Sequence, residues 1–283
     1  MTIEPSYDER FPTPAVRRWV RTCWIQSAGS SPYVQRNLPT GGMELRYQVG
    51  GGLTILGPLT SVLEEVLPPH AIVVGIRFRP GAPIAAGRPA VELADVVLPA
   101  RELWGKTADD LADRLASSRR PEAALVLLNG YLRRLLAPIA GDHLVRSVIE
   151  DLMPWRTTQL STVADAHNLS GSQLRRRVLD TVGLSPKVLQ RTLRFQGYLA
   201  LAQAAAEPTF RIADAAALAG YADQSHLTRE CVRLSGRTPA ELLGPRTDVC
   251  GCGHDHSASY VPFLRGRAFR SIVSHRDLLA SPT

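Results

Sequence analysis

The chain has 283 residues, of which 45% are hydrophobic and 21% are charged, enough apolar material for two domains that each bury a core. Its formal net charge of +7 favours an anionic partner, although charge alone does not distinguish a nucleic acid from a membrane surface. The apolar runs end well before about 18 residues and the N-terminus is polar, so we expect a cytoplasmic protein without a membrane helix or signal sequence.

Residues 1–104 carry many Gly and Pro residues between short apolar runs, a texture typical of a β-rich domain. The expected strands are residues 18–26, 43–49, 53–56 and 72–78. Three consecutive glycines at positions 50–52 provide the hairpin turn between the second and third strands.

Charged residues on the expected strands of this domain suggest a binding site at first sight. Glu44 and Arg46 lie two apart on one strand, as do Arg77 and Arg79 at the end of another. Residues two apart share a face, so these side chains most simply form a solvated or paired cross-strand row. His70 stands alone in a turn, and no nucleophile or carboxylate pair has an activating neighbour. The sequence therefore predicts no enzyme.

Residues 105–140 are expected to form a helical linker. Leu103, Leu111 and Leu115 recur at helical spacing, and a second segment is rich in leucine from position 125 to position 136. The second helix is apolar over a wide arc, which must be covered by other protein. We expect it either to pack into the first domain or to pair with a second copy of the chain in a homodimer.

Residues 141–245 contain a first helix-turn-helix pattern. A short apolar helix at residues 160–166 is followed by a turn at Asn168 and by Ser170, which can cap a helix over residues 171–181. The outward face of that helix carries four polar side chains: Ser172, Arg175, Arg176 and Arg177. Adjacent arginines also fit a merely solvated face, but their position after a capped turn favours DNA contact, with Arg177 meeting phosphate.

A second helix-turn-helix pattern follows a long helix from Pro186 to about residue 206. Ile212, Ala216 and Ala219 form a narrow apolar stripe, and Gly220 ends that helix. Asp223 can cap the next helix, whose polar face offers donors and acceptors suited to reading base edges: Gln224, Ser225, His226 and Arg229. A packed helical hairpin without DNA is the alternative.

The second pattern resembles a signature of the AraC/XylS transcription regulators. The resemblance rests on Gly220-Tyr221, Asp223-Gln224-Ser225, Leu227, Arg229, Gly236 and Thr238-Pro239. Cys231 departs from the family, which usually has Phe there. The resemblance implies that Ser172, Arg175 and Arg176 contact bases. It also implies that a connecting helix containing Arg194-Phe195 holds the two units about one DNA turn apart.

Three stretches in the first domain, PTGGMELRY, GPLT and GIRFRPGA, resemble an uncharacterised domain attached to many AraC-type regulators. This resemblance covers about residues 10–105. It implies a sensing or assembly role and does not name a ligand.

Residues 246–283 form a tail with four soft or borderline metal ligands at alternating positions: Cys250, Cys252, His254 and His256. Their number fits a closed tetrahedral zinc site, although copper(I), nickel or cobalt would also suit these ligands. A linker with incidental Cys and His residues is the alternative. Residues 260–264 are expected to form a short strand, followed by a basic patch of Arg265, Arg267 and Arg270.

The sequence thus predicts an α+β protein with a β-rich sensor or assembly domain, a helical linker and an all-α domain with two helix-turn-helix units. The expected function is sequence-specific transcription regulation on double-stranded promoter DNA, in response to a small molecule or a metal ion. The alternative is a ligand-binding protein or enzyme whose helical domain no longer binds DNA. The two differ in whether DNA binding depends on sequence and on salt.

Overall fold

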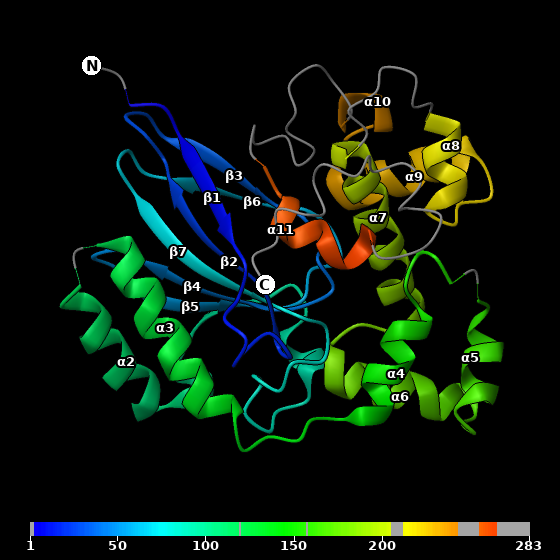
Figure 1. Ribbon diagram of the computed structural model, residues 1–283, viewed down its shortest axis with the longest axis horizontal. Coiled ribbons are helices and arrows are strands. Elements are labelled where there is room, and N and C mark those ends of the chain that lie inside the picture. Colours follow the sequence, from blue (N-terminus) through cyan, green and yellow to red (C-terminus); the bar gives the residue numbers. More distant parts are fainter. Residues whose placement is uncertain (1–2, 119, 157, 205–211, 243–254, 265–283) are drawn as a thin grey trace.

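A six-stranded antiparallel sheet and a separate strand pair build the N-terminal domain in the computed structural model (Figure 1). The structure describes residues 3–118, 120–156, 158–204, 212–242 and 255–264. The large sheet has the order β1 (Ser6–Arg10), β2 (Val20–Ser27), β7 (Ile72–Phe78), β4 (Glu44–Gln48), β5 (Leu53–Leu56) and β8 (Val97–Pro99). The pair consists of β3 (Tyr33–Asn37) and β6 (Leu63–Leu67). The four strands expected from the sequence are confirmed: two have the expected ends, and two have ends shifted by one or two residues.

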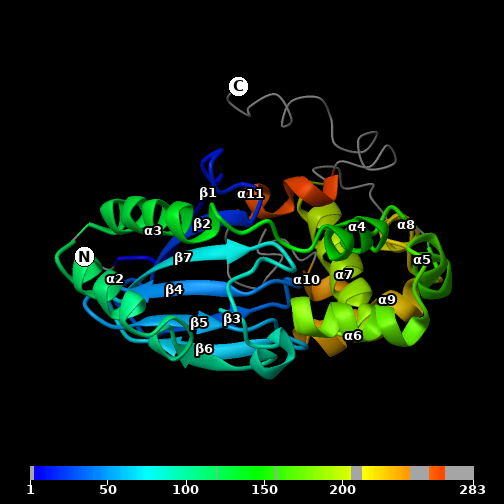
Figure 2. The same cartoon turned by 90° about the horizontal axis from the view of Figure 1, so that it is seen from below.

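Strand alternation gives the large sheet one apolar face and one polar face. On the apolar face, Leu45 lies opposite Ile76 and Tyr47 opposite Val74, and all four side chains are buried. The helices that follow the sheet are η1 (Ala90–Leu93), α1 (Arg101–Trp104), α2 (Lys106–Ala116) and α3 (Pro121–Leu136). Leucines of α2 and α3 share a buried cluster with this face, and both helices lie along the sheet in Figure 2. The apolar arc of the expected linker therefore packs into the N-terminal domain.

The polar face of the same sheet is also buried, which requires its charges to be paired. Glu44 lies opposite Arg77, and Arg46 lies opposite Gly75. Gly75 is required there because a Cβ would lie 2.0 Å from Cε2 of Trp24, whose indole covers the glycine. The Trp24 ring also stacks on Tyr7, with 5.8 Å between the ring centroids.

In the C-terminal helical domain, residues 142–242, every regular element among the described residues is a helix. Its helices are α4 (His143–Asp151), α5 (Leu160–Ala166), α6 (Gly171–Val182), α7 (Pro186–Ala204), α8 (Ile212–Leu218), α9 (Gln224–Ser235) and α10 (Pro239–Leu242). The central helix α7 contributes Leu189, Leu193, Phe195 and Tyr198 to one buried cluster that also includes side chains of α6 and α9. Among the described residues, no helix is long and apolar enough to cross a membrane.

Residues 255–264, hereafter the docked tail, return from the helical domain to the N-terminal domain. They form α11 (Ser257–Tyr260) and the 3-10 turn η2 (Val261–Leu264). In Figure 1 α11 lies between the sheet and α7. The expectation of a strand over residues 260–264 was wrong. Pro262 has no N–H to donate to a sheet, and Phe263 and Leu264 bury their side chains in the cluster built around α7.

Candidate nucleic-acid interface and interdomain contacts

Helix α6 presents the polar face that the sequence predicts. The side chain of Ser170 accepts a hydrogen bond from the N–H of Gln173, whose own side-chain oxygen accepts from the N–H of Ser170, a complete capping box. Leu174 and Val178 point into the core. Four side chains on the other faces are exposed: Ser172, Arg175, Arg176 and Arg177. The capped, packed helix therefore holds these side chains toward solvent on a fixed frame.

Arg177 differs from the other two arginines because it already has a partner. Its Nε donates to Oδ2 of Asp142 at 2.8 Å, and its side chain is 51% exposed. Asp142 also caps α4, so Arg177 ties α6 to the start of the helical domain. Burial raises the pKa of Asp142, but the bonds from Arg177 and from the α4 backbone outweigh it and lower that pKa. Arg175 and Arg176 are better placed to contact bases.

Helix α9 forms the second candidate reading face. Asp223 caps it by accepting from the N–H of His226 at 2.6 Å, and Gly236 ends it in the left-handed conformation. Gln224, Ser225 and Arg229 are exposed. His226 is half-buried, with its ring edge against Tyr221 at 5.3 Å between ring centroids. The structure therefore leaves three of the four predicted side chains fully available on this helix.

Helix α7 joins the two units, as the resemblance implies. Nε of Arg191 on α7 donates to Oε2 of Glu230 on α9 at 2.7 Å, a largely buried ion pair. On the other side, Nε2 of Gln190 donates to the carbonyl of Thr158, just before α5, at 2.9 Å. One helix thus carries polar contacts to both helix-turn-helix units, which limits their independent motion.

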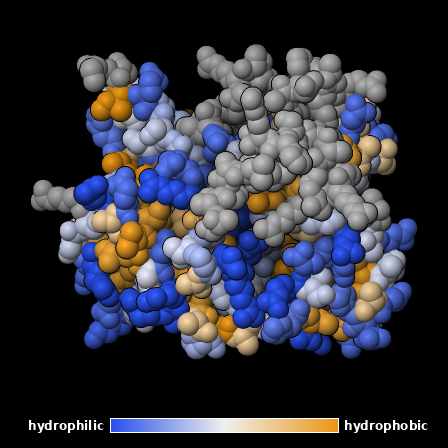
Figure 3. All heavy atoms as spheres, viewed as in Figure 1, coloured by the Kyte–Doolittle hydropathy of each residue, from blue (hydrophilic) through white to orange (hydrophobic). Residues whose placement is uncertain are grey.

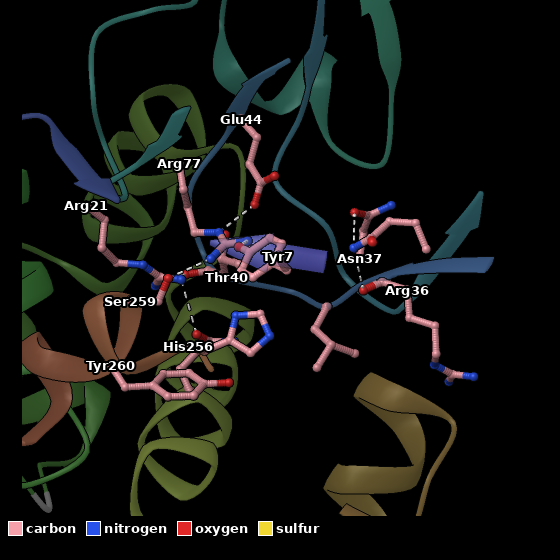
Figure 4. Close-up of a pocket in the computed structure, with 13 residues that line it drawn as sticks. Tyr7, Arg21, Arg36, Asn37, Thr40, Glu44, Arg77, His256, Ser259 and Tyr260 are labelled. Carbon is pink, nitrogen blue, oxygen red and sulfur yellow. Dashed lines mark hydrogen bonds and ion pairs between the residues drawn. The ribbon is translucent and has the colours of Figure 1, made fainter. Parts of the chain in front are cut away.

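The charged row on the polar face of the sheet is paired and buried (Figure 4). Nε of Arg77 donates to Glu44 at 2.7 Å, and its Nη1 donates to Glu9 at 3.0 Å. The paired form of the expected row is therefore confirmed, whereas solvation of these charges is not. Arg79 lies beyond the strand end, where its Nε donates to the carbonyl of Arg17 at 3.0 Å. Sequence patterning could not show that Glu9, more than thirty residues away along the chain, completes this row.

The docked tail reaches the same charges. Glu9 accepts from the N–H of Ser259 at 2.8 Å and from its hydroxyl at 2.7 Å, and Nδ1 of His256 lies 2.9 Å from the same carboxylate. Burial raises the pKa of Glu9, but the bond and charge of His256, with Arg77, outweigh it and hold the pKa well below its ordinary value. Gln203 of α7 accepts from the N–H of His256 at 3.1 Å. The tail therefore bridges both domains.

The structure describes one of the four predicted metal ligands. Cys250, Cys252 and His254 lie outside the described residues, whereas His256 is buried and bound to Glu9. Within the part of the chain that the structure describes, no three metal-ligating side chains come together. The basic patch of Arg265, Arg267 and Arg270 also lies outside the described residues.

A groove of about 650 Å³ opens between the domains, from the start of β2 to α4. Trp19, Ile149 and Phe263 form apolar walls. Five of its lining residues are arginines: Arg17, Arg18, Arg21, Arg79 and Arg146. Among the described lining residues, only Asp142 and Glu150 are acidic. The groove thus combines apolar surface with an excess of positive charge.

Comparison with protein families agrees with this architecture. Residues 163–244 match a helix-turn-helix domain family, HTH_18, and residues 8–99 match a domain of unknown function, DUF6597. The helix-turn-helix of this match is of AraC type. The chain therefore combines an AraC-type helix-turn-helix domain with a DUF6597 domain. The recognition made from the sequence is confirmed, as is the mixed fold, and the family supports a DNA-binding transcription regulator.

Solved structures of ToxT from Vibrio cholerae resemble the chain at a distance. One, at 1.65 Å resolution, has a TM-score of 0.43 and 11% identity, and covers 86% of this chain and 98% of ToxT. Another, ToxT from strain SCE256 with an unsaturated fatty acid bound, has a TM-score of 0.41 and 9% identity, with 86% and 95% coverage. Likenesses this distant do not identify a ligand for this AraC-type protein. No curated protein matches the chain.

Proposed function

We propose that this protein binds promoter DNA sequence-specifically through α6 and α9, and that a small molecule bound between its domains alters that binding. The observation that carries the first part is the pair of capped helices with exposed polar faces, joined through α7. Ser172, Arg175 and Arg176 read bases in one major groove, and Gln224, Ser225 and Arg229 read bases in the next. Arg177, held by Asp142, contacts phosphate from the edge of the face.

The test is to locate a specific site beside the protein's own gene and to measure affinity for it and for unrelated DNA at several salt concentrations. Replacing Arg175 or Arg229 with alanine should cost about 1 to 3 kcal/mol of specific binding and relax preference at one position. Arg114→Ala, an exposed arginine of α2, is the charge-matched control. Equal weakening on all sequences would make Arg175 and Arg229 phosphate contacts.

Wild-type protein that binds every sequence alike would support the alternative, a ligand-binding protein or enzyme whose helical domain has lost DNA binding. Sedimentation of the full chain tests the homodimer that we also propose. A dimer in solution must use surface other than the apolar arc of α3, because that arc is already packed on the sheet.

The groove between the domains is the effector site that we propose. Its volume lies within the range of roughly 300 to 1,000 Å³ that is usual for small-molecule sites. Its apolar walls and excess of arginines fit a molecule with an apolar body and an anionic group. Because both domains line the groove, the ligand affects their relative arrangement, and it shifts DNA binding only as far as it prefers one arrangement.

A panel of aliphatic and aromatic carboxylates, each paired with its uncharged primary alcohol, tests the effector class. Carboxylates should raise the unfolding temperature and change operator affinity, and the paired alcohols should do so less. Arg146→Ala should reduce the response, whereas Arg114→Ala should preserve it. A response that is equal for acid and alcohol would exclude an anionic effector.

The tail cluster of Cys250, Cys252, His254 and His256 is proposed as a site for one divalent metal, zinc in the first instance. Zinc uptake and operator affinity are followed together in metal-free protein and in a Cys250→Ser, Cys252→Ser variant. Because the ring of His256 is bound to Glu9, metal binding that recruits it should also disturb the docked tail. Equal, weak uptake by both proteins would remove the site.

A further inference from the structure

Both candidate recognition helices end against the N-terminal domain. At the end of α6, Gly183 adopts φ +86°, and a Cβ there would lie 2.6 Å from the carbonyl oxygen of Ala90 and 2.7 Å from Pro58. At the end of α9, Nη2 of Arg36 on β3 donates to the carbonyl of Ser235 at 2.6 Å. The helix starts, which carry the reading faces, remain exposed.

The Arg36 bond is chemically specific. The last carbonyls of a helix have no partner within the helix and carry the negative end of its dipole, so a cation that donates to them stabilises the terminus. Ser235 is 1% exposed, and its hydroxyl already donates to the carbonyl of Cys231. The charged donor to the Ser235 carbonyl comes from the other domain, from Arg36.

Strand β3 is a firm support for this contact. Nη1 of Arg36 is paired with Glu64 on β6 at 2.7 Å, which fixes the guanidinium from the second side. On the opposite face of β3, Nδ2 of Asn37 donates to Glu65 at 2.6 Å, and Glu65 is paired with Arg46 of the large sheet. In Figure 4, Arg36 points away from the Glu44 and Arg77 pair. Displacing β3 would break these bonds as well as the bond to α9.

We propose that Arg36 is a positioning residue for DNA reading: it holds the C-terminal end of α9, while the backbone near Ala90 abuts the end of α6. The N-terminal domain thereby acts as a splint that fixes how the two reading faces are placed relative to each other. This inference rests on the proposed function, since it assigns the two helices to two half-sites. A rearrangement of the N-terminal domain that moves β3 then alters the DNA contacts of α9, and so affects one half-site selectively.

The first experiment needs no DNA. Amide hydrogen exchange is compared in the full-length wild type, Arg36→Ala, Arg36→Lys and Arg101→Ala, the last removing an equal charge from an exposed side chain. Arg36→Ala should speed exchange in the last turn of α9 by about tenfold and leave α6 unchanged, in line with the worth of a charge at a helix terminus. Arg36→Lys should recover part of the protection. Equal exchange in Arg36→Ala and Arg101→Ala would overturn the proposal.

The second experiment uses hydroxyl-radical footprints on the specific site. Arg175→Ala and Arg229→Ala first identify the half-sites read by α6 and α9. Arg36→Ala should then lose protection at the α9 half-site by about tenfold in affinity and keep the α6 half-site. Equal loss at both half-sites would overturn the positioning role. If wild type binds without sequence preference, the proposed function fails, and the exchange experiment still decides whether Arg36 holds α9.

Discussion

Replacing Glu9 with glutamine should release the docked tail from the N-terminal domain. The Glu9 side chain is 3% exposed and, within the part of the chain that the structure describes, accepts four bonds from three residues beyond its own strand: two from Ser259, one from His256 and one from Arg77. Glutamine has nearly the same shape, but one of its two oxygen positions becomes an NH₂ group that faces a donor. The variant therefore changes bonding with little change in packing.

The magnitude follows from the bonds lost. A hydrogen bond to a charged group contributes roughly 1.5 to 3 kcal/mol, and removing one partner of a buried ion pair costs roughly 3 to 5 kcal/mol. Arg77 keeps Glu44 as a partner, so the lower part of that range applies. A loss of about 3 kcal/mol reduces the ratio of docked to undocked tail roughly 100-fold.

Amide hydrogen exchange over residues 257–264 measures tail docking directly. Exchange in Glu9→Gln should be roughly 100-fold faster there than in wild type, while the buried strands β4 and β7 keep their protection. Glu92→Gln, which neutralises a half-exposed carboxylate of the same domain, should behave like wild type. If the tail amides exchange at the same rate in Glu9→Gln and Glu92→Gln, the Glu9 carboxylate does not hold the tail, and the reasoning from buried bonds is wrong.

The remaining predictions concern pH, packing and thiol reactivity. The pKa of Glu9 is lowered in the folded protein, so the stability that Glu9 contributes is present above the ordinary Glu pKa of about 4.3 and is lost as the pH falls below it. The free energies of unfolding of wild type and Glu9→Gln, measured by chemical denaturation at several pH values, should therefore converge in acid. Gly75→Ala should lower the free energy of unfolding by about 1 to 3 kcal/mol or more, because the new methyl overlaps Trp24, and thermal unfolding measures the loss. Burial raises the pKa of the Cys231 thiol to about 12, so iodoacetamide should leave it unmodified in native protein and react only after unfolding.

The helices of the C-terminal domain could be predicted closely because the residues that set their ends act locally. Capping residues such as Ser170 and Asp223 and the turn glycines Gly220 and Gly236 fix where helices begin and end, and each acts within a few residues of its own position. The departure at Cys231 proves to be a fully buried thiol in the same cluster as Tyr198 and Tyr221. The residues predicted to contact DNA lie on the helices that the spacing indicated, and their contact with DNA stays a prediction.

The interdomain contacts could not be predicted because they depend on long-range placement. Glu9 reads as one more charge in a polar N-terminus, and β1, β3 and β6 lack a strong apolar alternation. Arg36 shows no sequence feature that distinguishes it from the other arginines, since its partner lies 199 residues away. In an arginine-rich chain, the sequence does not distinguish arginines that would contact DNA from arginines that hold domains together. The two kinds can be told apart only from their positions in the fold.

The outer surface and the interdomain contact differ in where their charges lie. On the face shown in Figure 3, hydrophilic residues surround smaller hydrophobic groups, as is usual for a surface in water. The charges of Glu9, Glu44 and Arg77 instead lie between the sheet and the docked tail.

Burying these charges makes the two domains depend on each other. Removing an ion from water costs several kcal/mol unless other bonds satisfy it, and here the tail supplies them through Ser259 and His256. If the helical domain and its tail moved away, water would replace those bonds, so the open state would recover much of the hydration free energy. The free energy needed to separate the tail from the sheet is therefore smaller than the number of bonds suggests. If the proposed effector binds in the groove, a preference of a few kcal/mol for one arrangement is enough to shift the population and, through the role that we propose for Arg36, the reading face of α9.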